Sequence, residues 1–181
     1  VAELAGKDPI EFRLELLQRA KDNPVGENNE YDPERLAGVL RLVREKSNWS
    51  QVPSGTHRGV SAYFCHNSYA AHVVDVVMDG DTPKVEKVVC AIDCGIVINP
   101  DAAANMAEGA IVDGVGNAMY GELTFKDGSP QQKNFDTYKM IRHAEAPNHI
   151  EVHFVQNEVD PTGMGEPPFP PVFGALSNAI Y

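Results

Sequence analysis

Residues 73–92 read VVDVVMDGDTPKVEKVVCAI, and this stretch decides the fold. Val73 to Met78 form a run of mainly β-branched residues, Asp79-Gly80-Asp81 is rich in turn formers, and residues 84–92 alternate before an apolar end. β-branched residues favour strands, and two such runs around a short turn favour a β-hairpin. Because residues 60–64 alternate as well, the sequence predicts a meander of two or three antiparallel strands.

Two amphipathic helices are predicted before this sheet, in a helical hairpin segment that spans residues 1–50. Asp8-Pro9 and Asp32-Pro33 each combine a capping side chain with proline at the first helical position. Apolar residues then recur at helical spacing, from residue 9 to about residue 21 and from residue 33 toward Trp49. Residues 23–29 contain the turn formers that would connect the two helices.

A third helix and further strands are predicted after the sheet. Asn99-Pro100-Asp101 begins an Ala-rich helix, in which Gly109, Gly114 and Gly116 indicate close packing against another backbone or a ligand. Residues 120–125 and 130–135 predict a second hairpin around a turn at 126–128, residues 150–155 another strand, and residues 170–181 a last helix. Residues 56–181 are therefore the α+β portion, and the predicted fold class is α+β, with an N-terminal helical hairpin, antiparallel strands and packed helices.

Composition narrows the class of protein. With 181 residues, 43% hydrophobic residues and a formal net charge of -11, the chain predicts a globular protein and argues against a nucleic-acid-binding surface. No apolar run approaches the roughly 20 residues of a membrane span, and no signal peptide is recognisable. Three cysteines without a close pair argue against a disulfide framework or an iron–sulfur site in this chain. Since Val1 is not an initiator methionine and an apolar pattern continues to Tyr181, we expect a piece of a larger protein, which leaves cytosol and periplasm both open.

One acidic residue near the carboxyl end stands between unusual neighbours. Residues 163–168 read GMGEPP, which places Glu166 between a flexible glycine pair and a rigid proline pair. Such neighbours hold a carboxylate in place and allow the backbone to approach a ligand closely. A simpler interpretation is a tight loop before the last helix, with Glu166 near the positive end of that helix. The residues alone leave both interpretations open.

Several motifs taken together resemble one family. They are DCGIVINP at residues 93–100, AEGA at 107–110, GEL at 121–123, GMGEPP at 163–168 and the apolar run at 171–180, with the opening AGKDPIEFR at 5–13. In this order they resemble the carboxy-terminal part of the molybdopterin-binding large subunit of molybdenum hydroxylases, the xanthine dehydrogenase and aldehyde oxidase superfamily. The bacterial two-subunit type, exemplified by the isoquinoline 1-oxidoreductase β subunit, is the most similar.

This resemblance implies an oxidoreductase that hydroxylates an N-heteroaromatic or aldehyde carbon with oxygen from water. Molybdopterin, the molybdenum cofactor, would bind in the full-length protein, and iron–sulfur clusters would lie in a partner small subunit. This chain by itself is expected to hold no cofactor and to be inactive. The remainder of the large subunit and a small-molecule substrate would be its other partners, a half-open groove would lie beside Gly165 and Glu166, and uncovered apolar surface could cause self-association.

The resemblance also assigns roles to individual residues. Glu166 falls on the essential glutamate of the family, a general base that takes a proton from the oxygen that the metal activates. The expected cofactor-binding residues are Thr162, Gly163, Met164 and Gly165 in the loop, and Met106 and Ala107 in the third helix. Family members commonly have Gln where this chain has Met106, and a thioether is a poor substitute for an amide. The alternative is therefore a non-catalytic scaffold or interaction domain that kept the fold and lost the cofactor.

Two other kinds of site find less support in the sequence. Cys65, His66 and His72 could suggest metal ligation, but neighbours in a strand point to opposite faces, so no metal ligands are predicted. A glycosidase-like pair of carboxylates could be sought among Glu108, Glu122 and Glu166. Their spacing selects no pair, so the molybdenum hydroxylase hypothesis is preferred.

Overall fold

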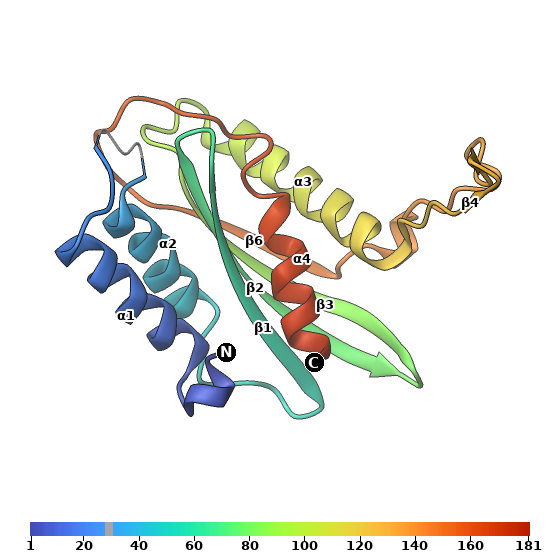
Figure 1. The fold of residues 1–181 in the computed structure, drawn as a ribbon, viewed down its shortest axis with the longest axis horizontal. Coiled ribbons are helices and arrows are strands. Elements are labelled where there is room, and N and C mark those ends of the chain that lie inside the picture. Colours follow the sequence, from blue (N-terminus) through green and yellow to red (C-terminus); the bar gives the residue numbers. More distant parts are fainter. Residues whose placement is uncertain (28–30) are drawn as a thin grey trace.

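The computed structural model describes residues 1–27 and 31–181 and contains a four-stranded sheet between two groups of helices (Figure 1). One group comprises η1 (Glu3–Ala5), α1 (Pro9–Asp22) and α2 (Pro33–Lys46). The sheet has the order β1-β2-β3-β6 and comprises β1 (Thr56–Cys65), β2 (Ser68–Asp79), β3 (Thr82–Asp93) and β6 (His149–Phe154). Its other face is covered by α3 (Pro100–Tyr120) and α4 (Pro170–Ile180). The predicted α+β class is confirmed, while the predicted turn formers Asn28 and Asn29 lie outside the described residues.

The first two helices begin where the sequence predicts. Asp8 Oδ1 accepts hydrogen bonds from the amides of Ile10 (2.9 Å) and Glu11 (3.0 Å), and the Asp32 carboxylate accepts one from the Glu34 amide (2.8 Å). These caps satisfy amides that no helical carbonyl can reach. α2 then turns its apolar stripe toward the sheet and α1 packs on α2, so the helical hairpin covers one face of the sheet through α2.

Both faces of the sheet are buried, which explains the nearly continuous apolar character of β2. One face packs on α2, with α1 behind it, through residues that include Leu40, Tyr69 and Val73. The other face packs on α3 and α4, through residues that include Val74 and Ile111. The first nine residues of β2 are all buried, as expected of a strand that is covered on both sides. In the described part of the chain, no helix is both long and apolar enough to span a membrane.

The direction of β6 differs from the predicted topology. β1, β2 and β3 form the expected antiparallel meander, with the turn between β2 and β3 at residues 80–81. β6, however, pairs with β3 in parallel, with Val88 opposite Ile150 and Ile92 opposite Phe154. The connection from β3 runs through α3, and a crossover of this kind returns the chain to the sheet in the same direction. The sheet is therefore mixed, whereas only antiparallel strands were predicted.

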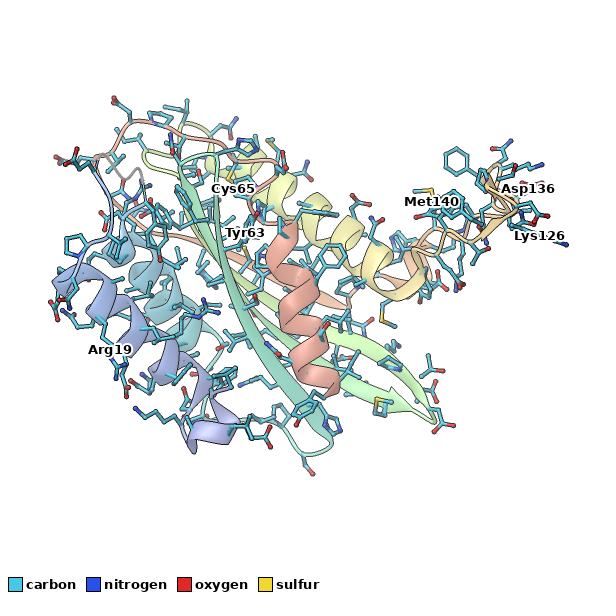
Figure 2. The ribbon with its side chains drawn as sticks, in the orientation of Figure 1. Arg19, Tyr63, Cys65, Lys126, Asp136 and Met140 are labelled. Carbon is cyan, nitrogen blue, oxygen red and sulfur yellow. The ribbon has the colours of Figure 1, made fainter. Side chains whose placement is uncertain are left out.

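The predicted second hairpin is wrong in its extent. α3 continues through Tyr120, and the only strands in this region are the two-residue β4 (Phe125–Lys126) and β5 (Ser129–Pro130). Residues 121–142 instead form an arm that projects from the body of the molecule, with Lys126, Asp136 and Met140 labelled on it in Figure 2. Phe125 and Phe135 on this arm are 65% and 71% exposed. Since an isolated two-stranded ladder without a covered face is marginal in water, the alternating pattern did not lead to longer strands.

The glycines of α3 behave in two ways. A Cβ added to Gly114 would lie 3.0 Å from the Val172 Cβ of α4, and one added to Gly116 would lie 2.7 Å from the Ile141 Cγ2. Close packing at these two positions is confirmed. A Cβ at Gly109 would meet no atom of another described segment within 4 Å, so close packing against a ligand stays a prediction at this position.

Candidate active site

The loop that contains Thr162 and Gly163 connects β6 with α4 and is tied to the sheet by hydrogen bonds. The Thr162 amide donates to the carbonyl of Cys94, just beyond β3, at 3.0 Å. The Gly163 amide donates to the carbonyl of His66 at 3.2 Å. Ser68, at the start of β2, contacts this loop twice, because its hydroxyl lies 2.6 Å from the Thr162 hydroxyl and donates to the Gly163 carbonyl. The chain that leads to Glu166 is thus fixed against two strand ends.

Asp93, at the end of β3, holds the surrounding elements together. Its carboxylate accepts two hydrogen bonds from the Arg35 guanidinium, 3.0 Å from Nε and 2.6 Å from Nη2, one from Asn157 Nδ2 (2.8 Å) and one from the Gly95 amide (3.2 Å). Burial would raise the pKa of Asp93, but the hydrogen bonds from Arg35, Asn157 and Gly95, together with the Arg35 charge, hold it below its usual value. Arg35 Nη1 also donates to the Asn67 carbonyl (3.3 Å). Three segments therefore meet at one buried carboxylate, and Arg35 links a fourth, the β1–β2 turn, to them.

Two glycines of the family motifs are required by close approach of the backbone. Gly95 has φ 73°, and a Cβ there would lie 2.3 Å from the Asp160 carbonyl oxygen and 2.6 Å from that of Val159. A Cβ on Gly163 would lie 2.6 Å from the His66 Cβ. Neither space admits a side chain, because real Cβ atoms do not approach other atoms so closely. The DCG and GMG motifs thus contain glycine where the loop crosses the sheet ends.

Glu166 has a fixed backbone and an exposed carboxylate. Its carbonyl accepts a hydrogen bond from the Phe169 amide (2.9 Å), and the intervening Pro167 and Pro168 are buried. Its Oε2 atom lies 3.0 Å from Nε2 of His66. The Glu166 side chain is 69% exposed and that of His66 57% exposed. The carboxylate therefore lies at the surface of this chain, with one close polar neighbour.

The two predicted cofactor-binding residues of α3, Met106 and Ala107, lie in different surroundings. Met106 is 49% exposed, and its Cε lies 3.0 Å from the place that a Cβ on Gly165 would occupy. Ala107 is fully buried in the core between α3, α4 and the sheet, where Met164 also packs. One exposed surface therefore contains Met106, Gly165 and Glu166, while the Ala107 methyl group packs in the core. Glu166 is exposed, but it is not remote from the third helix.

Backbone amides in the loop are available to a ligand. The amides of Thr162 and Gly163 are used within the chain, whereas those of Gly165 and Glu166 donate to no residue in the described ranges. Both of the latter residues are exposed. Adjacent free amides in a glycine-containing loop suit an anionic or oxo group, since their N–H dipoles can point at one acceptor. The donor set present here therefore fits a cofactor with phosphate and oxo groups.

A groove and clusters of metal-binding side chains are two further features that could hold a ligand. A groove of about 750 Å³ lies elsewhere, between α1, β1 and the end of α4, and is lined by residues such as Phe12, Leu40 and Val60. Gly165 and Glu166 are both exposed, and the half-open groove expected beside them stays a prediction. Within residues 1–27 and 31–181, no group of three or more His, Cys, Asp or Glu side chains is arranged to hold a metal ion.

His66 is the neighbour of Glu166 that sequence reasoning missed. It forms a two-residue turn with Asn67 between β1 and β2, and both residues have positive φ angles, 51° and 57°. Cys65, labelled in Figure 2, precedes this turn; burial raises the pKa of its thiol, and the nearby Glu166 charge raises it further. A His-Asn pair between two apolar runs can be recognised as a turn. No local signal, however, links residue 66 with residue 166.

Comparison with known families decides the assignment. Residues 28–147, more than half of the chain, match the family of molybdopterin cofactor-binding domains. The chain belongs to this family. The resemblance to large subunits of molybdenum hydroxylases, drawn above from the sequence motifs, is therefore confirmed.

Relatives of this molybdopterin cofactor-binding domain are several times longer. Over its whole length the chain is 31% identical to the "membrane-bound aldehyde dehydrogenase (pyrroloquinoline-quinone)" of Gluconacetobacter polyoxogenes, of which it covers 24%. Over 99% of its length it is 28% identical to isoquinoline 1-oxidoreductase subunit beta of Brevundimonas diminuta, of which it covers 22%. The crystal structure of quinoline 2-oxidoreductase from Pseudomonas putida 86 matches 62% of the chain and 15% of its own chain, with a TM-score of 0.58 and 21% identity, which shows a shared fold. The domain thus spans less than a quarter of the two relatives compared over its length.

Proposed function

We propose that this domain is part of the large subunit of a molybdenum hydroxylase that oxidises an N-heteroaromatic or aldehyde carbon, with Glu166 as general base. The observation that carries the proposal is the position of Glu166, whose backbone is fixed between the β1–β2 turn and α4 and whose carboxylate is exposed beside Met106. The names of the two relatives, an aldehyde dehydrogenase and an isoquinoline oxidoreductase, support these substrate classes. The remainder of the large subunit and an iron–sulfur small subunit are the proposed partners.

The roles of the residues follow from their chemistry. When bound, the molybdopterin cofactor would supply the redox centre that accepts electrons from the substrate and activates water. Glu166 would accept a proton there, which an ionised carboxylate does well because it has only acceptor atoms. The amides of Gly165 and Glu166 would donate to the cofactor, and the lack of a side chain on Gly165 would allow the cofactor to approach the backbone. Thr162, Gly163 and Met164 would hold this loop in position.

Replacement of the base in the assembled enzyme tests this function. Glu166→Gln keeps the shape of the side chain and removes its basicity, so kcat for an aldehyde or N-heteroaromatic substrate should fall by at least about 100-fold. Molybdenum content, measured by mass spectrometry, should stay unchanged. Glu158→Gln is the matched control, because Glu158 is an exposed acid in the same loop. A Glu166→Gln enzyme with full activity and full molybdenum content would exclude the proposed role.

A scaffold domain without cofactor is the second candidate, and Met106 is the observation that favours it. The thioether of Met106 cannot supply the hydrogen bonds of the family's glutamine at this exposed position next to Gly165. Metal analysis of the purified full-length complex separates the two candidates. Stoichiometric molybdenum supports the enzyme, whereas a correctly assembled complex without molybdenum supports the scaffold. The isolated domain is expected to be inactive in either case.

A further inference from the structure

We propose that His66 is a positioning residue that orients the Glu166 carboxylate; this inference rests on the proposed function of Glu166 as the base. The two residues are 100 positions apart in the sequence, and their side chains meet where the β1–β2 turn touches the loop before α4. His66 Nε2 and Glu166 Oε2 are 3.0 Å apart, which is the distance of a hydrogen bond. With a proton on Nε2, the imidazole donates to Oε2 and leaves Oε1 as the free acceptor.

The backbone of His66 is fixed as firmly as that of Glu166. His66 and Asn67 occupy the two central positions of a hairpin turn with positive φ angles, so the turn has one defined conformation. The His66 carbonyl accepts the Gly163 amide at 3.2 Å, and the His66 Cβ lies against the Gly163 backbone. The Arg35 guanidinium holds the other half of the turn through the Asn67 carbonyl. Donor and acceptor are therefore both presented by anchored segments.

The contact is suited to orientation more than to stability. Both side chains are more than half exposed, and exposed ion pairs contribute little to the free energy of folding. A glutamate side chain has several rotatable bonds, however, and an unrestrained carboxylate would sample many directions. A base must reach its proton at hydrogen-bond distance, so one contact that keeps Oε1 pointed away from His66 increases the fraction of productive orientations.

The chemistry distinguishes His66 from the other groups near Glu166. The Met106 thioether is at most a weak acceptor and cannot donate to a carboxylate. The nearby Cys65 thiol is a weak donor, and the charge of Glu166 helps to keep it protonated. Among the described residues, His66 is the side chain for which a hydrogen bond to the Glu166 carboxylate is found. Removing its donor should therefore leave the carboxylate unrestrained.

The test uses the assembled enzyme and three variants of His66, of which Asn suits the left-handed backbone of the turn. His66→Asn fits the left-handed backbone but is too short to reach Oε2 in the same way, while His66→Phe keeps the ring and removes the donor. In both variants we expect kcat to fall about tenfold with little change in KM, because the contact orients the base and does not touch substrate. His66→Gln, whose amide can donate to the carboxylate, should stay within about threefold of the wild type. His57→Ala, which removes an exposed histidine from β1, the strand that precedes the turn, should have wild-type kcat.

A structural readout separates positioning from a general loss of activity. Crystal structures of the assembled His66→Asn and His66→Phe enzymes should show the Glu166 carboxylate in several orientations or in a new one, with Gly163 and Ser68 unmoved and molybdenum content unchanged. Wild-type kcat, or an unmoved Glu166 carboxylate, in both variants would overturn the inference about His66 alone. Full activity of Glu166→Gln would overturn the proposed function itself, so the two failures are distinguishable.

Discussion

Removal of the Arg35 side chain is expected to destabilise this domain by about 2–4 kcal/mol. The Asp93 side chain is 2% exposed and that of Arg35 is 18% exposed, so Arg35→Ala would leave a buried carboxylate without its cation. Loss of one partner of a buried ion pair typically costs about 3–5 kcal/mol. We expect a somewhat lower value, because Asn157 and Gly95 still donate to Asp93 and Arg35 is partly exposed. Part of the loss comes from the Tyr69 ring, whose centroid lies 4.7 Å beneath the guanidinium carbon.

Urea unfolding at pH 7 measures this effect. With a slope of about 2 kcal/mol per molar urea, the midpoint of Arg35→Ala should fall by about 1–2 M. Arg41→Ala is the matched control in the same helix, because Arg41 pairs with Glu34 at 2.6 Å but both side chains are about half exposed, at 54% and 47%. An exposed pair of this kind contributes less than about 1 kcal/mol. Equal midpoints for the two variants would refute the reasoning about burial.

The loss of stability in Arg35→Ala should depend on pH. The pKa of Asp93 is lowered in the folded chain, so the stability that this carboxylate contributes is present above its unfolded pKa, about 4, and is lost as the pH falls through the folded value. The difference in unfolding free energy between the wild type and Arg35→Ala should therefore be constant near neutral pH and shrink below about pH 4. A constant difference down to pH 2 would contradict the assignment of the charge to Asp93.

Two further substitutions test local features of the fold. Gly95→Ala should lower the free energy of unfolding, measured in urea, by at least about 3 kcal/mol, because the added Cβ would collide with the Asp160 carbonyl. Gly80 also has a positive φ angle (62°) but lies in open space, so Gly80→Ala should lower it by only about 1–2 kcal/mol. His72 is fully buried, neither of its ring nitrogens has a hydrogen-bond partner in the described part of the chain, and burial lowers its pKa to about 3. Between about pH 6 and pH 3, the His72 imidazole is therefore protonated only in the unfolded chain. The free energy of unfolding of the wild type should rise with pH in this range, and His72→Leu should reduce that slope by about 1.4 kcal/mol per pH unit. An unaltered slope would contradict the burial of a neutral imidazole.

Local patterns predicted most of the secondary structure because the interactions that specify it are local. Asp8 and Asp32 cap their own helices within two or three residues, and Asn99 does the same for α3. The β-branched run at residues 73–78 and the turn after it also specify a hairpin by themselves. The arm at residues 121–142 shows the limit of this reasoning, since its alternating pattern has no covered face in this chain and did not lead to long strands.

The candidate site was predictable in part. The GMGEPP motif pointed to Glu166 and to a backbone that approaches a ligand; the close approach found at Gly163 is to the His66 Cβ of the same chain. Met106 lies beside Gly165, and its role toward the cofactor stays a prediction, whereas the sequence could not reveal that Ala107 is buried in the core. The direction in which a helical residue faces depends on which side of the helix the sheet covers, and that is a tertiary property.

By itself, the sequence determined the helix starts, the central hairpin, the α+β class and the family, because each depends on short-range chemistry or on motifs that can be recognised in order. Only the tertiary structure decided that β6 pairs with β3 in parallel, that Asp93 and Arg35 together join four segments, and that His66 meets Glu166. These contacts join residues 58 to 100 positions apart, or strands separated by a helix. Such pairings are set by the packing of both sheet faces, which no local pattern encodes.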